Sequence, residues 1–303
     1  MKIGLALGGG GVRGFAHVLV LKTLDDMGMK PSMIVGTSMG AIVGALYASG
    51  ISGQSLLERM HEFSVMKKDS WLDIYNKREK LLEWLDVFSL ESARGGFLKP
   101  EGLFERLMKQ INATTFEELD IPFTAIAADY WTAEEVVFNQ GELQPAIQAS
   151  MAVPGVFAPV SYQDRVLIDG GVVNIVPYDH LKPDCDLIIA VDVGGTRHPD
   201  ETPVPNMLES LLGTIDLMQE SMLANKLEDD PPDIYIRPEI KDVKMMDFMA
   251  IEEVLDQAQP AIDELIEKLK QYQDCLLYTS DAADDVSTVL ISVGGVWVRG
   301  GGG

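Results

Sequence analysis

Short apolar runs alternate with helix-like segments at the start of the chain. Residues 2–7 are apolar enough for a buried strand, and residues 15–27 have the apolar spacing of a helix that stops near Gly28. A second short run, residues 33–35, precedes a helical stretch over residues 41–48. This alternation predicts an α/β protein of three layers, with a central, largely parallel sheet between helices.

The same pattern continues further along the chain. Residues 121–128 and 135–138 are read as paired strands, and residues 165–168 and 187–192 as two more. Residues 56–107 are mostly helical in pattern, and residues 251–273 form a charged amphipathic helix.

The pentapeptide Gly36-Thr37-Ser38-Met39-Gly40 lies between the second apolar run and the second helix. A serine on a sharp strand-to-helix turn is held in a strained conformation with its hydroxyl exposed, and the glycines on either side let the backbone pass close by. The first N–H groups of the helix point at whatever binds there, and the helix dipole favours negative charge. The pattern is typical of an acyl-transfer nucleophile.

A glycine-rich turn, residues 8–14, joins the first strand to the first helix. Its consecutive N–H groups suit a phosphate or an oxyanion. The competing interpretation is a dinucleotide site, because residues 9–14 fit G-x-G-x-x-G. That fold requires an acidic residue at the end of the second strand, whereas Asp25 and Asp26 fall on the preceding helix. The sequence therefore favours the oxyanion.

A third motif, Asp169-Gly170-Gly171, follows the strand-like residues 165–168. An aspartate before two glycines sits in a tight turn, so its carboxylate can project into a site. Taken alone, the motif is better explained by a turn residue that caps its own backbone. The other two motifs make a role in a site the better interpretation.

These three motifs, in this order, resemble the patatin-like phospholipase family, and within it a bacterial branch related to the catalytic domain of neuropathy target esterase. The similarity extends over about residues 1–270 and includes the segments 95–98, 149–159 and 187–192. The resemblance implies a three-layer α/β/α fold and a lipid acyl ester as substrate. It also implies a Ser-Asp dyad without histidine, in which Ser38 is the nucleophile and Asp169 the base.

Further site residues follow from the resemblance. The oxyanion hole is expected from N–H groups of the glycine loop and of the residue after the nucleophile: Gly9, Gly10, Gly11 and Met39. The motifs are completed by Arg13, Gly14, Gly36, Gly40, Gly170 and Gly171. No metal and no cofactor is expected.

The histidines agree with a dyad, because none follows the pattern of a catalytic histidine; the chain has four, His17, His61, His180 and His198. A carboxylate can take the serine proton instead, provided that burial or pre-organisation strengthens it as a base. Arg13 has two interpretations. In the first it has a functional role, in which it either stabilises the loop or binds a lipid phosphate. In the second it is a residue of the first helical turn that solvates its own charge. Residues 56–107 are either helices packed on the sheet, which we favour, or a flap over an acyl channel.

Composition restricts the partners. The chain of 303 residues is 47% hydrophobic and carries a formal net charge of −23, which excludes nucleic acid and disfavours stable docking on an anionic membrane. Transient contact with a lipid surface remains compatible, and the methionines around residues 207–249 suit either such a surface or an adaptable core. The oligomeric state is not predicted.

Targeting signals are not apparent in the sequence. The first apolar run is itself a motif strand, no segment approaches the ~20 apolar residues of a membrane span, and the two cysteines give neither a disulfide framework nor a metal site. We expect a cytoplasmic protein.

The far end differs from the rest. Residues 275–284 resemble the translation of a sequencing-library adapter, and residues 300–303 are a run of glycine. We therefore expect a catalytic domain over residues 1–274 and a non-native tail over residues 275–303, without the natural C-terminus. The alternative is a genuine strand followed by a flexible glycine tail.

The expected activity is that of a serine esterase of the phospholipase A or lysophospholipase type. Three alternatives stay open beside it, the weakest of which is the nucleotide-binding protein considered above. An acyltransferase would use the same dyad, and a catalytically silent regulatory protein would keep only the fold.

Overall fold

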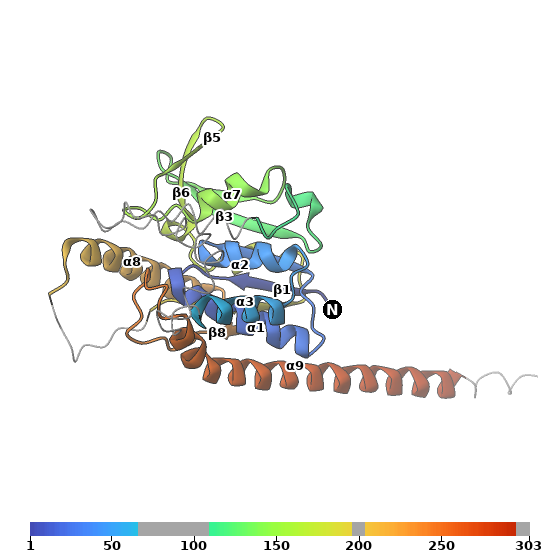
Figure 1. The fold of residues 1–303 in the computed structure, drawn as a ribbon. Coiled ribbons are helices and arrows are strands. Elements are labelled where there is room, and N and C mark those ends of the chain that lie inside the picture. The colour runs from blue at the N-terminus through green and yellow to red at the C-terminus, as the bar shows by residue number, and fades with distance from the viewer. Residues whose placement is uncertain (66–108, 196–203, 295–303) are drawn as a thin grey trace, which may run out of the picture. The chain divides into compact units, whose positions relative to one another are not determined.

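A computed structural model describes residues 1–65, 109–195 and 204–294 (Figure 1). Within these residues the strands are β1 (Ile3–Leu7), β2 (Met33–Thr37), β3 (Phe123–Asp129), β4 (Glu135–Phe138), β5 (Val160–Tyr162), β6 (Arg165–Asp169), β7 (Leu187–Val191) and β8 (Ile234–Ile236). The helices are α1 (Ala16–Asp26), α2 (Met39–Ala48), α3 (Gly53–Val65), α7 (Leu143–Ser150), α8 (Met207–Asp229) and α9 (Ile251–Gly294). Short 3₁₀ helices are η1 (Gly11–Phe15), η4 (Phe116–Glu118), η5 (Gly170–Val172) and η6 (Tyr178–Leu181).

The strands form one mixed sheet in the order β5-β6-β3-β2-β1-β7-β8, and β4 also pairs with β3. Neighbours from β3 through β2, β1 and β7 to β8 are parallel, whereas β4, β5 and β6 pair antiparallel. Every residue of β1 and β7 is buried, as in parallel strands that helices cover on both faces. The predicted mostly parallel sheet is confirmed, with an antiparallel edge added.

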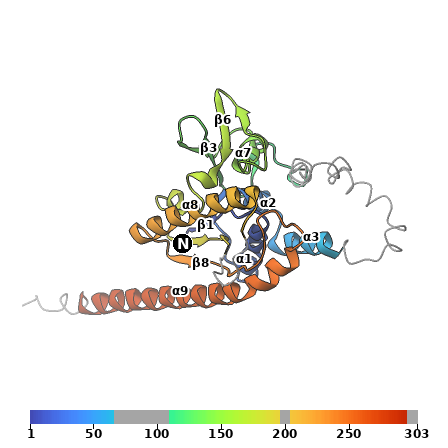
Figure 2. The same ribbon diagram turned by 90° about the vertical axis from the view of Figure 1, so that its left-hand side faces the viewer.

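Helices cover the two faces of this sheet. On one face, α2 packs against β1, β2 and β3. On the other, buried residues of the strands, such as Ala6, Val35 and Ile188, share a core with Tyr178 of η6 and Leu223 of α8. Figure 2 shows α1 and α3 together on one side of β1. The predicted three-layer architecture is confirmed.

The local predictions agree with the observed elements. The helix expected at residues 15–27 is preceded by the turn of η1, and the expected strand pair at residues 121–128 and 135–138 is β3 and β4. Of the helical pattern over residues 56–107, α3 covers the beginning; residues 66–108, including 95–98, lie outside the described residues. None of the helices in the described ranges has the length and apolarity that a membrane crossing requires.

The chain divides into two compact units, Met1–Ile262 and Asp263–Gly303. The helix α9, expected to end near residue 273, continues to Gly294, so residues 275–294 are helical rather than a strand. The foreign origin of residues 275–303 stays a prediction.

Candidate active site

Ser38 occupies the sharp turn between β2 and α2. Its backbone has φ 55° and ψ −122°, a region that residues with side chains rarely adopt, and the side chain is buried to 7% exposure. The turn is possible only with glycine at its flanks, because a Cβ at Gly40 would lie 2.0 Å from the Leu7 carbonyl oxygen, and one at Gly36 would lie 2.4 Å from the Gly40 carbonyl oxygen. The sequence motif therefore forms the strained turn, or elbow, that it predicts, but Ser38 is buried, which corrects the prediction of an exposed hydroxyl.

The glycine loop after β1 lies beside this turn. The N–H of Gly9 donates to the carbonyl of Ile175 at 3.0 Å, so it is committed to the fold; this corrects the prediction of Gly9 as an oxyanion donor. Among the described residues, the N–H groups of Gly10 and Gly11 have no acceptor. The N–H of Met39 begins α2 and has no partner within the helix by position. Three predicted donors thus remain.

Arg13 is buried to 5% exposure beneath the glycine loop. Its Nε donates to the Gly10 carbonyl at 3.2 Å, and its terminal nitrogen lies 3.5 Å from Asp216 of α8. The carbonyl and N–H of one trans peptide point in opposite directions, so this bond turns the N–H of Gly11 away from the guanidinium. Arg13 is thus a stabiliser of the loop, and the alternative that it solvates its own charge is wrong.

We expect the substitution Arg13→Met to lower kcat for ester hydrolysis by about 10- to 100-fold, because the Gly11 N–H loses its fixed direction. Lys22→Met is the matched control, since it removes a positive charge from an exposed pair with Asp26 on α1. Steady-state kinetics of both variants decide the matter. Equal kcat in the wild type and Arg13→Met would contradict this role.

Asp169 ends β6 and caps the 3₁₀ helix η5. Its Oδ1 accepts the N–H of Gly171 at 2.7 Å, whereas its buried Oδ2 accepts no hydrogen bond from any residue that the structure describes. Burial raises the pKa of the Asp169 carboxyl to about 6, against the lowering effects of the nearby Ser38 hydroxyl and the Gly171 N–H. Ser38 is thus an electrostatic neighbour of Asp169 without a formed hydrogen bond, a common state of catalytic pairs before substrate binds.

The register of the sheet brings Ser38 and Asp169 together. Thr37 of β2 pairs with Ile126 of β3, and the next residue of β3, Ala127, pairs with Asp169 of β6. Ser38 and Asp169 therefore stand at one level with only β3 between them, about 10 Å apart along the sheet for two strand spacings. Side chains directed to the same edge can bridge that separation.

The histidines take other roles. His17 is fully buried, its Nε2 lies 2.8 Å from the Gly8 carbonyl oxygen, and burial lowers its pKa to about 4, so it is neutral and packs under the loop. His61 pairs with Glu252 at 3.0 Å. His198 lies outside the described residues, and none of the other three bonds to Ser38.

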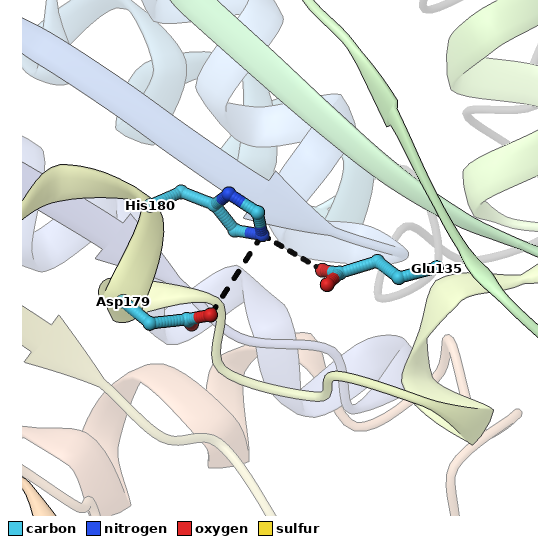
Figure 3. A group of neighbouring side chains, drawn as sticks. All are labelled: Glu135, Asp179 and His180. Atoms are coloured by element: carbon cyan, nitrogen blue, oxygen red, sulfur yellow. Dashed lines mark hydrogen bonds and ion pairs between the residues drawn. The ribbon is translucent and has the colours of Figure 1, made fainter.

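Glu135, Asp179 and His180 are the one group in the described ranges with the residue types and spacing of metal ligands (Figure 3). His180 Nε2 lies 2.9 Å from Glu135 and 3.8 Å from Asp179. The two carboxylates also accept from the amide of Asn174, and the Lys226 ammonium pairs with Asp179. The hydrogen bond from Glu135 raises the pKa of His180. The charges are thus already compensated, and the group is an ion-pair network between β4, η6 and α8.

Two residues that bind the nucleophile turn, Ser150 and Asn174, were not predicted from the sequence. Ser150 Oγ accepts the N–H of Ser38 at 3.0 Å, and the Thr37 hydroxyl donates to the Asn174 carbonyl at 2.9 Å. The signal for Ser150 was its place in the segment 149–159, which carried the resemblance without an assigned role. Asn174 had no signal, because its contact uses the backbone.

Two curated proteins illustrate what this chain is similar to in sequence. An uncharacterised NTE-family protein of Mycobacterium tuberculosis is 35% identical over 208 residues, which cover 68% of this chain and 53% of the relative. Lysophospholipase NTE1 of Saccharomyces cerevisiae is 26% identical over 278 residues, 83% of this chain and 16% of that protein. The chain thus spans about half the length of the mycobacterial relative and less of the yeast one.

Among solved structures, VipD of Legionella pneumophila matches with a TM-score of 0.46 and 12% identity over 87% of this chain and 66% of that one. The sequence profile of the family described as patatin-like phospholipase matches residues 5–182, more than half of the chain. The protein therefore belongs to the patatin-like phospholipase family.

Proposed function

We propose that this protein is a lipid acyl ester hydrolase that uses Ser38 and Asp169 as a catalytic dyad. One observation carries the proposal: the buried carboxylate of Asp169, with its pKa raised to about 6 and its Oδ2 free of hydrogen bonds from the described residues, stands at the level of the strained Ser38. A base with a pKa near the working pH is the stronger proton acceptor that a serine without histidine requires.

The proposed chemistry has two halves. Ser38 Oγ attacks the ester carbonyl carbon while its proton passes to Asp169, and the N–H groups of Gly10, Gly11 and Met39 bind the oxyanion. The bond to the leaving alcohol then breaks, and Asp169 returns the proton to that alcohol. Water attacks the acyl-enzyme with Asp169 again as base, which releases the fatty acid and restores the Ser38 hydroxyl.

The proposed substrate class is supported by the family and by the yeast relative, whose name is lysophospholipase. We extend this to the present chain as a lipid with an ester-linked acyl group, of the phospholipase A or lysophospholipase type.

A test combines substrate and label. The full chain is assayed with chromogenic acyl esters of increasing chain length and with lysophosphatidylcholine, and a fluorophosphonate label is mapped by mass spectrometry. We expect release of fatty acid and label on the peptide that contains Ser38. Acyl transfer to an added alcohol in place of fatty acid release would favour the acyltransferase, and no label with no turnover would favour a silent protein.

A further inference from the structure

The turn that ends α7 is bonded to the backbone of both members of the dyad. Ser150, the last residue of α7, accepts the N–H of Ser38 on its hydroxyl oxygen at 3.0 Å. Two residues later, the carbonyl of Ala152 accepts the N–H of Asp169, also at 3.0 Å. Ser150 and Ala152 are buried, at 0% and 2% exposure, so water does not compete for either bond.

We propose that Ser150 is a positioning residue, and that residues 150–152 form a clip that fixes the backbones of Ser38 and Asp169 relative to each other. The proposal rests on the dyad proposed above. It gives the segment 149–159 a mechanical role in catalysis that its sequence alone does not indicate.

At its Ser38 end, the clip holds a residue whose backbone conformation is strained. With φ 55° and ψ −122°, Ser38 lies outside the regions open to most side chains, and such conformations persist only when the surroundings over-determine them. Its N–H precedes α2 and has no acceptor in the helix. The Ser150 hydroxyl is the acceptor that the elbow itself cannot supply, and it leaves the Ser38 Oγ free for chemistry.

The Asp169 end is anchored through the sheet. The helix α7 packs against β3 and β6, the strand between the two residues and the strand that carries Asp169. Its residues Leu143, Ala146, Ile147 and Ala149 are buried at 0% exposure, so the helix cannot shift independently of those strands. The helix ends at Ser150, and two residues later the carbonyl of Ala152 accepts the N–H of Asp169, the last residue of β6. A movement at either end of the clip therefore changes the distance between nucleophile and base.

A second hydrogen bond at the same turn does not depend on Ser150. The Thr37 hydroxyl donates to the Asn174 carbonyl at 2.9 Å, and Asn174 follows Asp169 by five residues. Loss of the Ser150 hydroxyl should therefore disturb the geometry of the dyad without unfolding the sheet.

The test is kinetic and uses the full chain. In Ser150→Ala we expect kcat to fall by about 10- to 100-fold while KM stays within about twofold, because a misplacement near 1 Å affects the chemical step more than binding. The rate of fluorophosphonate labelling at Ser38 should fall by a similar factor. Ser150→Thr keeps a hydroxyl and should recover most of the loss.

Ser49→Ala is the matched control. Ser49 donates its hydroxyl to the Leu46 carbonyl at 2.8 Å at the far end of α2, so its removal should leave kcat unchanged. A kcat of Ser150→Ala within about twofold of wild type would overturn the proposal. So would an equal fall in Ser150→Ala and Ser150→Thr, because it would mean that the hydroxyl is not what matters.

Hydrogen exchange of the wild type tests the clip without any substitution, so the result does not depend on whether a variant folds. We expect the amide of Ser38 to exchange slowly, with the amides of the core strands, because Ser150 holds it. Exchange as fast as that of a surface amide would overturn the clip. If the wild type hydrolysed no ester, the proposed function would fail, whereas this exchange measurement would still decide whether the clip exists.

Discussion

Ser38→Ala should lower kcat/KM for acyl ester hydrolysis by about 10⁴-fold or more, because no other group can form the acyl-enzyme. Steady-state kinetics with a soluble short-chain ester measure this effect without the complication of lipid aggregates. A variant that kept a tenth of the wild-type rate would contradict Ser38 as the nucleophile and would move attention to another serine or to direct attack by water.

Ser38→Gly separates chemistry from strain at the same position. Its activity should be as low as that of Ser38→Ala, but it should be more stable by about 1 kcal/mol or more, since glycine reaches φ 55° without a Cβ penalty. Denaturant unfolding of the two variants gives the difference directly. Equal stabilities would mean that the elbow stores no strain.

Asp169→Asn should reduce kcat/KM by about 10³-fold or more, because an amide cannot accept the serine proton. In the wild type, kcat/KM should rise with pH through about 6 and level off above it, as the Asp169 carboxyl, with its pKa of about 6, loses its proton. A pH profile measured from 5 to 8 tests this, and a flat profile would contradict Asp169 as the base.

The same substitution should stabilise the fold above pH 6. The pKa of Asp169 is raised from 3.8 to about 6, so the folded state holds the proton more tightly; that contribution is fully present below 3.8 and is lost as the pH rises through 6. At pH 8 the buried, ionised carboxylate costs up to about 3 kcal/mol, at 1.36 kcal/mol for each pKa unit. Asp169→Asn should recover part of that cost.

The titration of His17 also changes the stability with pH, and its effect must be distinguished from that of Asp169. Its pKa is lowered from 6.5 to about 4, so it acts with the opposite sign: its contribution is present above 6.5 and is lost as the pH falls through 4. Because His17 is the same in both proteins, it cancels in the difference between the unfolding free energies of Asp169→Asn and wild type. We expect that difference to grow from pH 5 to pH 8, and a variant less stable than wild type at pH 8 would contradict it.

Much of the fold was predictable because its signals are local. The apolar run of β1, the glycines of the loop and the periodicity of α1 each act over a few residues, and each formed the element expected. The same holds for the nucleophile turn, because Gly36 and Gly40 are needed by contacts within the turn and with the end of β1. The pair of Ser38 and Asp169 was predicted only through the resemblance, since 130 residues lie between them in the sequence.

The sequence by itself determined the strand-loop-helix units and the identity of the residues that each unit presents at its carboxyl edge. Only the tertiary structure decided which of those groups are available to the candidate active site. The antiparallel pairing of β6 with β3 set Asp169 at the level of Ser38, and Ile175 took the N–H of Gly9. Burial turned the Arg13 side chain into a support of the glycine loop, and burial also raised the pKa of the Asp169 carboxyl. These outcomes depend on hydrogen bonds and desolvation between residues far apart in the chain, which no local pattern records.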